Sequence, residues 1–160
     1  MTLARLTLAA AGLAAAATFM MLPSAPPAQA DEVSTYGGHC RKNDGAGREF
    51  AQDYYVYFDT NSSRIKPEGH ERIEYVHGIA TGHEAGQICI YGKSSKQGNV
   101  QANQALSRKR ALNVAHAFEA LGWPRSRIVI VPEGEAWGWL EDTLTSDSED
   151  DRRVRLHLSH

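Results

Sequence analysis

The sequence shows no excess of positive charge that would suit a nucleic-acid partner. Its 160 residues carry 17 Lys and Arg against 19 Asp and Glu, a formal net charge of −2 at pH 7. Nucleic-acid binding depends on basic side chains that neutralise phosphates, so this balance argues against it. Four acidic residues gather near the C-terminal end: Asp147, Glu149, Asp150 and Asp151. Their spacing is not that of a calcium loop, and it predicts a solvated loop instead.

Motifs for catalysis and for metal or cofactor binding are missing as well. The seven histidines include no His-Glu-x-x-His or comparable metal spacing. No Gly-x-Ser-x-Gly motif marks a nucleophile, and no carboxylates are paired at a readable spacing for glycoside cleavage. We therefore expect a protein that is not an enzyme and holds no metal or cofactor. Trp123, Trp137 and Trp139 are expected to pack at core edges, with sugar stacking by Trp137 or Trp139 left open.

Cysteine is scarce, with only Cys40 and Cys89. Cys89 lies in a strand-like run, 88–91, and Cys40 in a glycine-rich leader. In an oxidising compartment a disulfide between them would close a loop of about 50 residues and stabilise the fold by roughly 4 kcal/mol. The alternative is that Cys89 is simply a small core residue, and both interpretations stay open at this point.

The first 30 residues differ in composition from the rest of the chain. Arg5 is their one charged residue, and an alanine- and leucine-rich run from 8 to 22 leads to Ala28-Gln29-Ala30, an A-x-A cleavage pattern. We predict that residues 1–30 are a cleaved signal peptide, which leaves no transmembrane segment. No cysteine follows the apolar run, so no lipid anchor is expected there. An uncleaved membrane span is the alternative, because the run approaches the length that crosses a bilayer.

The remainder predicts one α/β domain. Residues 31–53 are polar and rich in glycine and predict an irregular N-terminal extension to a domain at 54–160. Strands are expected at 54–58, 87–91, 128–131 and 152–158, and helices from Pro67 and from Asn103. The order β-α-β-α-β-β predicts an α/β sandwich in which two main helices pack on one face of a four-stranded mixed sheet. We expect mostly parallel strands, with a last strand that could run antiparallel.

The helix that starts at Asn103 places an arginine on its apolar side. At about 100° per residue, Arg110 falls in the arc formed by Leu106, Val114, Ala117, Phe118 and Leu121. A second arginine, Arg152, shares the inward register of the last strand. A buried guanidinium needs an anion, because desolvating an unpaired charge costs several kcal/mol. That anion is either a carboxylate of the protein or a carboxylate of a ligand.

Three segments carry a resemblance to a known family: the run 56–69 (VYFDTNSSRIKPEG), the pattern Asn103-x-x-Leu106-Ser107-x-x-Arg110-Ala111-x-x-Val114, and Asp151-Arg152-Arg153-Val154. In their order and spacing they resemble the OmpA-like C-terminal domain, a peptidoglycan-binding family, and the resemblance extends over about residues 54–158. The resemblance implies the fold expected above and non-covalent binding of the peptidoglycan stem peptide. It also implies a place in the periplasm of a Gram-negative bacterium, in association with the outer membrane, where the protein would link or stabilise the envelope.

The resemblance also suggests a site. In the family, an aspartate after the second strand holds the ammonium of diaminopimelate and the helix arginine holds its carboxylate. Arg110 matches that arginine, whereas the aspartate position falls on Ser95, between Lys93 and Lys96. The candidate ligand-binding residues are Arg110, Ser95, Asp59, Asp151, Arg152 and Asn103.

Three interpretations of the missing carboxylate stay open. Asp59 or Asp151 could supply the charge, or the pocket could favour a more anionic ligand. Alternatively, Arg110 pairs inside the protein with one of these aspartates, and the fold serves an envelope protein partner.

Overall fold

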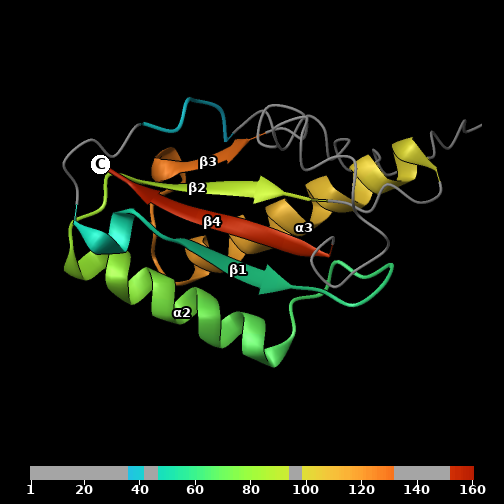
Figure 1. Cartoon of the computed structure of the whole chain (residues 1–160), viewed down its shortest axis with the longest axis horizontal. Helices are drawn as coiled ribbons and strands as arrows, with labels where there is room; N and C mark the ends of the chain where they lie inside the picture. Colours follow the sequence, from blue (N-terminus) through green and yellow to red (C-terminus); the bar gives the residue numbers. More distant parts are fainter. Residues whose placement is uncertain (1–35, 42–46, 94–98, 132–151) are drawn as a thin grey trace, which may run out of the picture.

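Four stretches of the chain, 36–41, 47–93, 99–131 and 152–160, are described by the computed structural model (Figure 1). The helices are α2 (Pro67–Gly82) and α3 (Val100–Ala120), with short 3-10 turns η1 (Arg48–Phe50) and η2 (Arg125–Arg127). The strands are β1 (Asp53–Tyr57), β2 (Gln87–Gly92), β3 (Ile128–Val131) and β4 (Arg153–Ser159). Several residues of the predictions above lie outside the described ones: the signal peptide 1–30, Ser95, Lys96, Trp137, Trp139 and the acidic residues 147–151.

The predicted elements form in the predicted order, and each strand begins and ends within one residue of its predicted bounds. Pro67 stands at the first position of α2, where its fixed φ suits a helix start. The helix buries Ile73, Val76 and Ala80, which lie on one side of it. The structure therefore confirms an α/β sandwich with two helices on a four-stranded mixed sheet.

The last strand does not add to the edge of the sheet. The strand order is β1-β4-β2-β3, and β4 runs antiparallel to both of its neighbours, while β2 and β3 pair in parallel. The helical crossovers leave β1, β2 and β3 pointing the same way. The expectation of a mostly parallel sheet is wrong for the pairings, because β4 fills the gap between β1 and β2 and makes two of the three pairings antiparallel.

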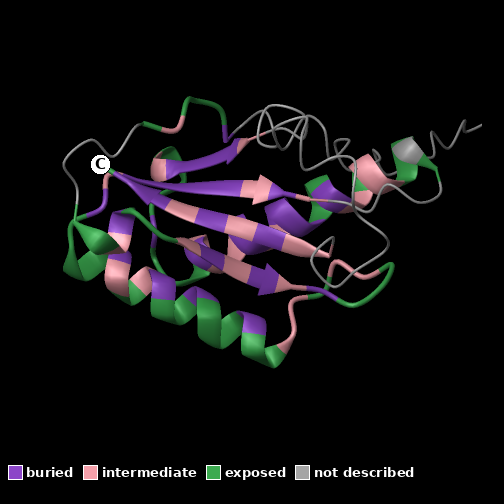
Figure 2. Ribbon diagram, viewed as in Figure 1, coloured by how far each residue is buried: buried purple, intermediate pink, exposed green. Residues whose placement is uncertain are grey.

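Both helices pack on the same face of the sheet. Val56, Val154 and Gly92 are successive partners across β1, β4 and β2, so their side chains share one face. On that face, Val56 approaches Gly69 of α2 and Gly92 approaches Ser107 of α3. Burial alternates along β1 and β4 accordingly, as Figure 2 shows.

The N-terminal leader is irregular, as expected, but it is packed against the domain. Tyr36 is 1% exposed, and its carbonyl accepts a hydrogen bond of 3.2 Å from the backbone N–H of Ile130, on the outer edge of β3. Its hydroxyl donates to Glu119 at 3.1 Å and accepts from Arg125 at 3.0 Å. The leader thus covers a free backbone group of an edge strand and ties itself to the end of α3.

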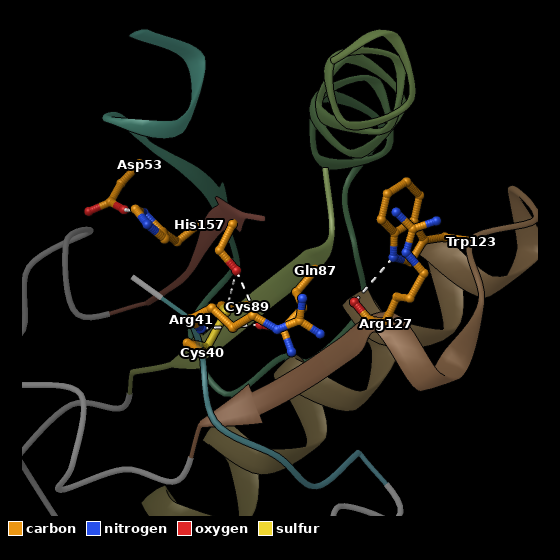
Figure 3. The surroundings of a disulfide bond; sticks show 9 residues. Cys40, Arg41, Asp53, Gln87, Cys89, Trp123, Arg127 and His157 are labelled. Atoms are coloured by element: carbon orange, nitrogen blue, oxygen red, sulfur yellow. Dashed lines mark hydrogen bonds and ion pairs between the residues drawn. A yellow bond between two sulfur atoms is a disulfide. The ribbon is translucent and has the colours of Figure 1, made fainter. Parts of the chain in front are cut away.

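A disulfide joins the leader to the sheet. Cys40 is bonded to Cys89 of β2, with their Cα atoms 5.9 Å apart (Figure 3). Beside it, the backbone N–H of Arg41 donates to the side-chain oxygen of Gln87 at 3.1 Å, and the hydroxyl of Ser159 donates to the same oxygen at 3.2 Å. Cys89 is fully buried, so the bond anchors the leader in the middle of the sheet.

Candidate functional site

The position of Arg110 follows from the close packing of α3 on β2. A side chain at Gly92 would place its Cβ 2.8 Å from the carbonyl oxygen of Ser107 and 2.9 Å from its hydroxyl. Only a glycine at this position therefore lets the helix backbone come so near the strand. Ser107 is 2% exposed and lies one helical turn before Arg110. The close contact sets the depth at which the arginine enters the protein.

Arg110 is 1% exposed and is among the largest fully buried side chains. Its Nε donates to the carbonyl of Ser62 at 2.8 Å, and its Nη2 donates to the carbonyl of Asp59 at 3.0 Å. The guanidinium also lies over the ring of Phe58, 5.2 Å from the centroid. The burial predicted from the helical period is therefore present, and the arginine holds the loop that follows β1.

A second side chain of α3 holds the same loop. The side-chain amide of Asn113 donates to the carbonyl of Ser63 at 2.7 Å. Together, Arg110 and Asn113 satisfy three backbone carbonyls of the loop between β1 and α2. Among the described residues, the partners of this guanidinium are neutral backbone carbonyls rather than a carboxylate.

No carboxylate of the described residues forms an ion pair with Arg110. The carboxylate of Asp59 is 64% exposed and lies 3.7 Å from the ammonium of Lys66. The interpretation that Asp59 neutralises Arg110 inside the protein is wrong for this side chain, because Arg110 contacts its backbone carbonyl instead. Asp151, the other aspartate considered, lies outside the described residues.

The surroundings of Arg110 disfavour the charged form of its guanidinium. Burial lowers the pKa of Arg110, because the charged form loses hydration, and the nearby charge of Arg152 lowers it further. Arg152 is half-buried, and its carbonyl accepts from the backbone N–H of Phe58 at 2.8 Å. Phe58 thus contacts both residues, the guanidinium of Arg110 through its ring and the carbonyl of Arg152 through its backbone N–H.

Other candidate residues gather at the same end of the sheet. Lys93 follows β2 directly and donates its backbone N–H to the carbonyl of Arg153, at the start of β4, at 3.3 Å. Asn103 is half-buried and lies seven residues before Arg110, on the same side of α3. The loop after β1, the end of β2, the start of β4 and the first half of α3 therefore meet around Arg110.

The sequence did not predict that backbone carbonyls of the loop after β1 bind Arg110 and Asn113, because every residue type has a backbone carbonyl.

The sequence also did not predict a polar cluster on the face of the sheet that the helices do not cover. There, the carboxylate of Asp53 lies 2.9 Å from Nδ1 of His157 and 3.0 Å from Nη1 of Arg155. His157 is half-buried and lies opposite Asp53 in the β1–β4 pairing.

In the part of the chain that the structure describes, no three or more His, Cys, Asp or Glu side chains are grouped so that they could hold a metal ion. Among the same residues, neither helix combines the length and apolar character that crossing a bilayer requires.

The sequence of residues 57–156 matches the model of the OmpA family. The chain belongs to this family. It is 29% identical over 105 residues to outer membrane protein A of Klebsiella aerogenes, covering 64% of this chain and 29% of that protein. It is 24% identical over 110 residues to the outer-membrane lipoprotein YfiB of Pseudomonas aeruginosa, covering 69% of this chain and 66% of the lipoprotein. The chain thus spans less than two thirds of the length of either relative.

Solved structures share the fold. The peptidoglycan-associated lipoprotein of Burkholderia pseudomallei superposes with a TM-score of 0.57 at 24% identity, over 72% of this chain and 98% of that one. The periplasmic domain of Helicobacter pylori MotB superposes with a TM-score of 0.53 at 15% identity, over 76% of this chain and 88% of that one. These relatives are envelope proteins, and membership of the family is consistent with an envelope role for this chain.

Proposed function

We propose that this protein is a non-catalytic periplasmic module that binds the peptidoglycan stem peptide non-covalently and so links or stabilises the cell envelope. The observation that carries the proposal is Arg110, a buried guanidinium that no described carboxylate neutralises. A relative named peptidoglycan-associated lipoprotein supports the choice of ligand. No cofactor enters the proposal. The predicted signal peptide, residues 1–30, would direct the chain to the periplasm, and the proposed place there is in association with the outer membrane.

The geometry of Arg110 leaves donors for such a ligand. A guanidinium carries five N–H groups, and two of those of Arg110 are used by the carbonyls of Asp59 and Ser62. In this proposal the other N–H groups bind a carboxylate of the stem peptide through charge-assisted hydrogen bonds, which are roughly twice as strong as neutral ones. Because the side chain is 1% exposed, the ligand must displace what covers it. The two carbonyls would fix the plane of the guanidinium before the ligand arrives, so little side-chain freedom is lost on binding.

The remaining candidate residues take supporting places in this proposal. Arg152 adds a second positive charge, which favours an anionic group at the same point. Asn103, on the Arg110 side of α3, offers an amide to the stem peptide. Ser95, Asp59 and Asp151 complete the proposed site, in which either aspartate would meet the ammonium that the family's aspartate otherwise holds.

A second function is favoured by one specific observation. Arg110 already bonds two carbonyls of the loop after β1, and Asn113 bonds a third. These bonds would be useful in a domain that binds no peptidoglycan, because they hold the loop against α3. In that case the fold would serve as a structural or interaction component, and its partner would be another protein of the envelope.

Co-sedimentation with purified peptidoglycan sacculi separates the two functions. The protein, expressed as the full chain, should pellet with sacculi, and Arg110→Ala should remain in the supernatant. Arg108→Ala is the matched control, because Arg108 is exposed two residues earlier on the same helix. Thermal unfolding of each variant, followed by circular dichroism, identifies any loss that is due to misfolding. Wild-type protein that stays in solution would favour the envelope-partner function instead.

A further inference from the structure

The disulfide between Cys40 and Cys89 joins two sulfur atoms whose surroundings differ. Cys89 lies in the middle of β2, on the face of the sheet that the helices leave uncovered, and it is fully buried. Cys40 belongs to the irregular leader over that face (Figure 3). It is partly exposed, and its neighbours His39 and Arg41 are exposed. A dissolved molecule therefore reaches the disulfide from the side of Cys40, not from that of Cys89.

Access decides which sulfur reacts in thiol–disulfide exchange. A thiolate attacks one sulfur of the disulfide in line with the S–S bond, and the second sulfur leaves on the far side. For attack on Cys40, the approach comes from the side that faces away from β2, because Cys89 lies beneath Cys40 in the sheet. For attack on Cys89, it would come from the buried interior. The geometry thus makes Cys40 Sγ the atom attacked and Cys89 Sγ the leaving group.

The surroundings of Cys89 suit a leaving sulfur. Its Sγ lies 4.0 Å from the hydroxyl of Ser159, which donates to the side-chain oxygen of Gln87 at 3.2 Å. A thiolate is a much stronger acceptor than a disulfide sulfur, so the rotatable hydroxyl can turn its proton from Gln87 to Cys89 as negative charge develops. Once protonated, Cys89 is a small apolar side chain that suits a buried position.

The leader can separate from β2 at Cys40 while the sheet stays intact. Residues 36–41 form no helix or strand, and within this run Tyr36 is the one buried residue. The non-covalent bond next to Cys40 is the one from the backbone N–H of Arg41 to Gln87, at 3.1 Å. Cleavage of the disulfide therefore removes the strongest attachment of this part of the leader.

We propose that Cys40 is a site of reversible thiol–disulfide exchange, at which a small external thiol forms a mixed disulfide and frees the leader from β2. The sulfur of that thiol bonds to Cys40 Sγ, and the Cys40–Cys89 bond breaks with its electron pair on Cys89 Sγ. Cys89 takes up a proton from water in place of the proton that the attacking thiol released. No further oxidant or reductant is consumed. The reverse attack, by Cys89 on the mixed disulfide, expels the small thiol and reattaches the leader.

The exchange changes how firmly the leader covers the edge of the sheet. The carbonyl of Tyr36 accepts from the backbone N–H of Ile130, on the outer edge of β3. With Cys40 in a mixed disulfide, the covalent attachment close to this bond is gone. The state of Cys40 thereby sets how easily the edge of β3 is uncovered, whether or not the Arg110 site binds a ligand.

Glutathione, a small monothiol, tests which sulfur is attacked. The full chain is incubated with glutathione under native conditions, quenched with acid at early times and mapped by mass spectrometry. We expect the adduct on Cys40 and a free thiol on Cys89. An adduct on Cys89, or none on either cysteine, would overturn the proposal.

The rate of exchange separates direct attack from attack on unfolded protein. Direct attack should be first order in glutathione and should change by less than about twofold in urea well below the unfolding transition, because little surface needs to be exposed. A rate that rises steeply over the same range of urea would mean that global unfolding exposes the disulfide, and the proposal would then be wrong.

Ser159→Ala tests the path of the leaving sulfur. We expect exchange to be roughly tenfold slower, because the hydrogen bond to the developing thiolate is lost. A purely structural Ser159 predicts the opposite, since losing its bond to Gln87 would loosen the attachment of Arg41 and speed the exchange. Thr81→Ala removes an exposed hydroxyl from α2 and should leave the rate unchanged. A Ser159→Ala rate equal to or faster than that of wild type would overturn the assignment of Cys89 as a leaving group assisted by Ser159.

Discussion

Asp53 and His157 face each other across the β1–β4 pairing, with 2.9 Å between a carboxylate oxygen and Nδ1 of the imidazole. The other carboxylate oxygen accepts from Arg155 at 3.0 Å. These three side chains join the first strand of the sheet to the last across the face that the helices leave uncovered. Among the described strands β1 pairs with β4, so this cluster reinforces the sheet pairing of an edge strand.

The cluster predicts a loss of stability in acid. Burial by itself raises the pKa of Asp53, but hydrogen bonds from His157 and Arg155, together with their charges, outweigh it and lower the pKa below the ordinary value of 3.8. A carboxyl whose pKa is lower in the folded state stabilises the protein above its unfolded pKa, and this contribution is lost as pH falls through the folded pKa. We therefore expect Asp53→Asn to be less stable than wild type at neutral pH, and the difference to shrink below about pH 4.

Urea unfolding at a series of pH values measures this difference. Glu74→Gln is a suitable control, because Glu74 is exposed on α2 and should change stability little at any pH. A difference between wild type and Asp53→Asn that stays constant from neutral to acid pH would contradict the prediction.

The disulfide predicts a second measurable contribution. Cys40 and Cys89 are 49 residues apart in the sequence, so their bond closes a long loop in the unfolded chain. Such a bond typically stabilises by 2–4 kcal/mol, and we expect a loss of about this size in Cys40→Ser. Wild-type protein should lose the same stability in reductant, whereas Cys40→Ser should not respond to it. Unfolding midpoints that are unaffected by reductant in both proteins would show that the bond contributes little.

Loss of the disulfide should also release the leader. Tyr36 is held by its backbone bond to Ile130 and by Glu119 and Arg125. With Cys40 free, we expect faster hydrogen exchange at the Ile130 amide, because its acceptor is no longer anchored close by. Exchange at the Ile90 amide, on the central strand β2, should change less and provides the internal reference.

Two glycines make a matched pair for testing how α3 is positioned. A Cβ at Gly92 would meet the backbone of Ser107 at 2.8 Å, so Gly92→Ala must move strand or helix and should cost roughly 1–3 kcal/mol. A Cβ at Gly78, within α2, would meet nothing within 4 Å. Gly78→Ala should therefore stabilise by up to about 1 kcal/mol, because alanine favours the helix. Thermal unfolding measures the stability of both variants. An unchanged stability of Gly92→Ala would mean that the close approach of α3 to β2 at Gly92 is not needed.

Much of the fold could be predicted from periodicity. Val154, Leu156 and Leu158 alternate with polar residues, and this alone places a strand with one buried face. The same alternation suits an edge or a central strand, so it could not show that β4 inserts between β1 and β2. The packing of Tyr36 against β3 and α3 could not be predicted either, because a single aromatic residue in a glycine-rich stretch forms no periodic pattern.

The site could be predicted only in part, for a similar reason. The helical period of α3 is enough to place Arg110 among apolar residues, and the structure buries it there. Its partners, the carbonyls of Asp59 and Ser62, depend on how the loop after β1 folds back over α3. Every residue has a backbone carbonyl, so the sequence cannot identify which one binds the arginine, whereas a carboxylate is visible as Asp or Glu. For Asp59, the sequence therefore suggested a side-chain carboxylate where the protein uses the main-chain carbonyl.

Ser95 provides the most direct test of the family's ligand mode. We propose, from the resemblance in sequence alone, that it occupies the position where the family has an aspartate for the ammonium of diaminopimelate. We expect Ser95→Asp to raise affinity for a synthetic stem tetrapeptide whose diaminopimelate side-chain amine is free by about tenfold, because a charge-assisted hydrogen bond replaces a neutral one. Ser94→Asp adds the same charge one residue earlier and should have a smaller effect. Calorimetric titration of both variants measures the difference. Equal gains would show that the added charge acts at long range, while a gain confined to Ser95→Asp would show that the pocket keeps the family's geometry and lacks only the carboxylate.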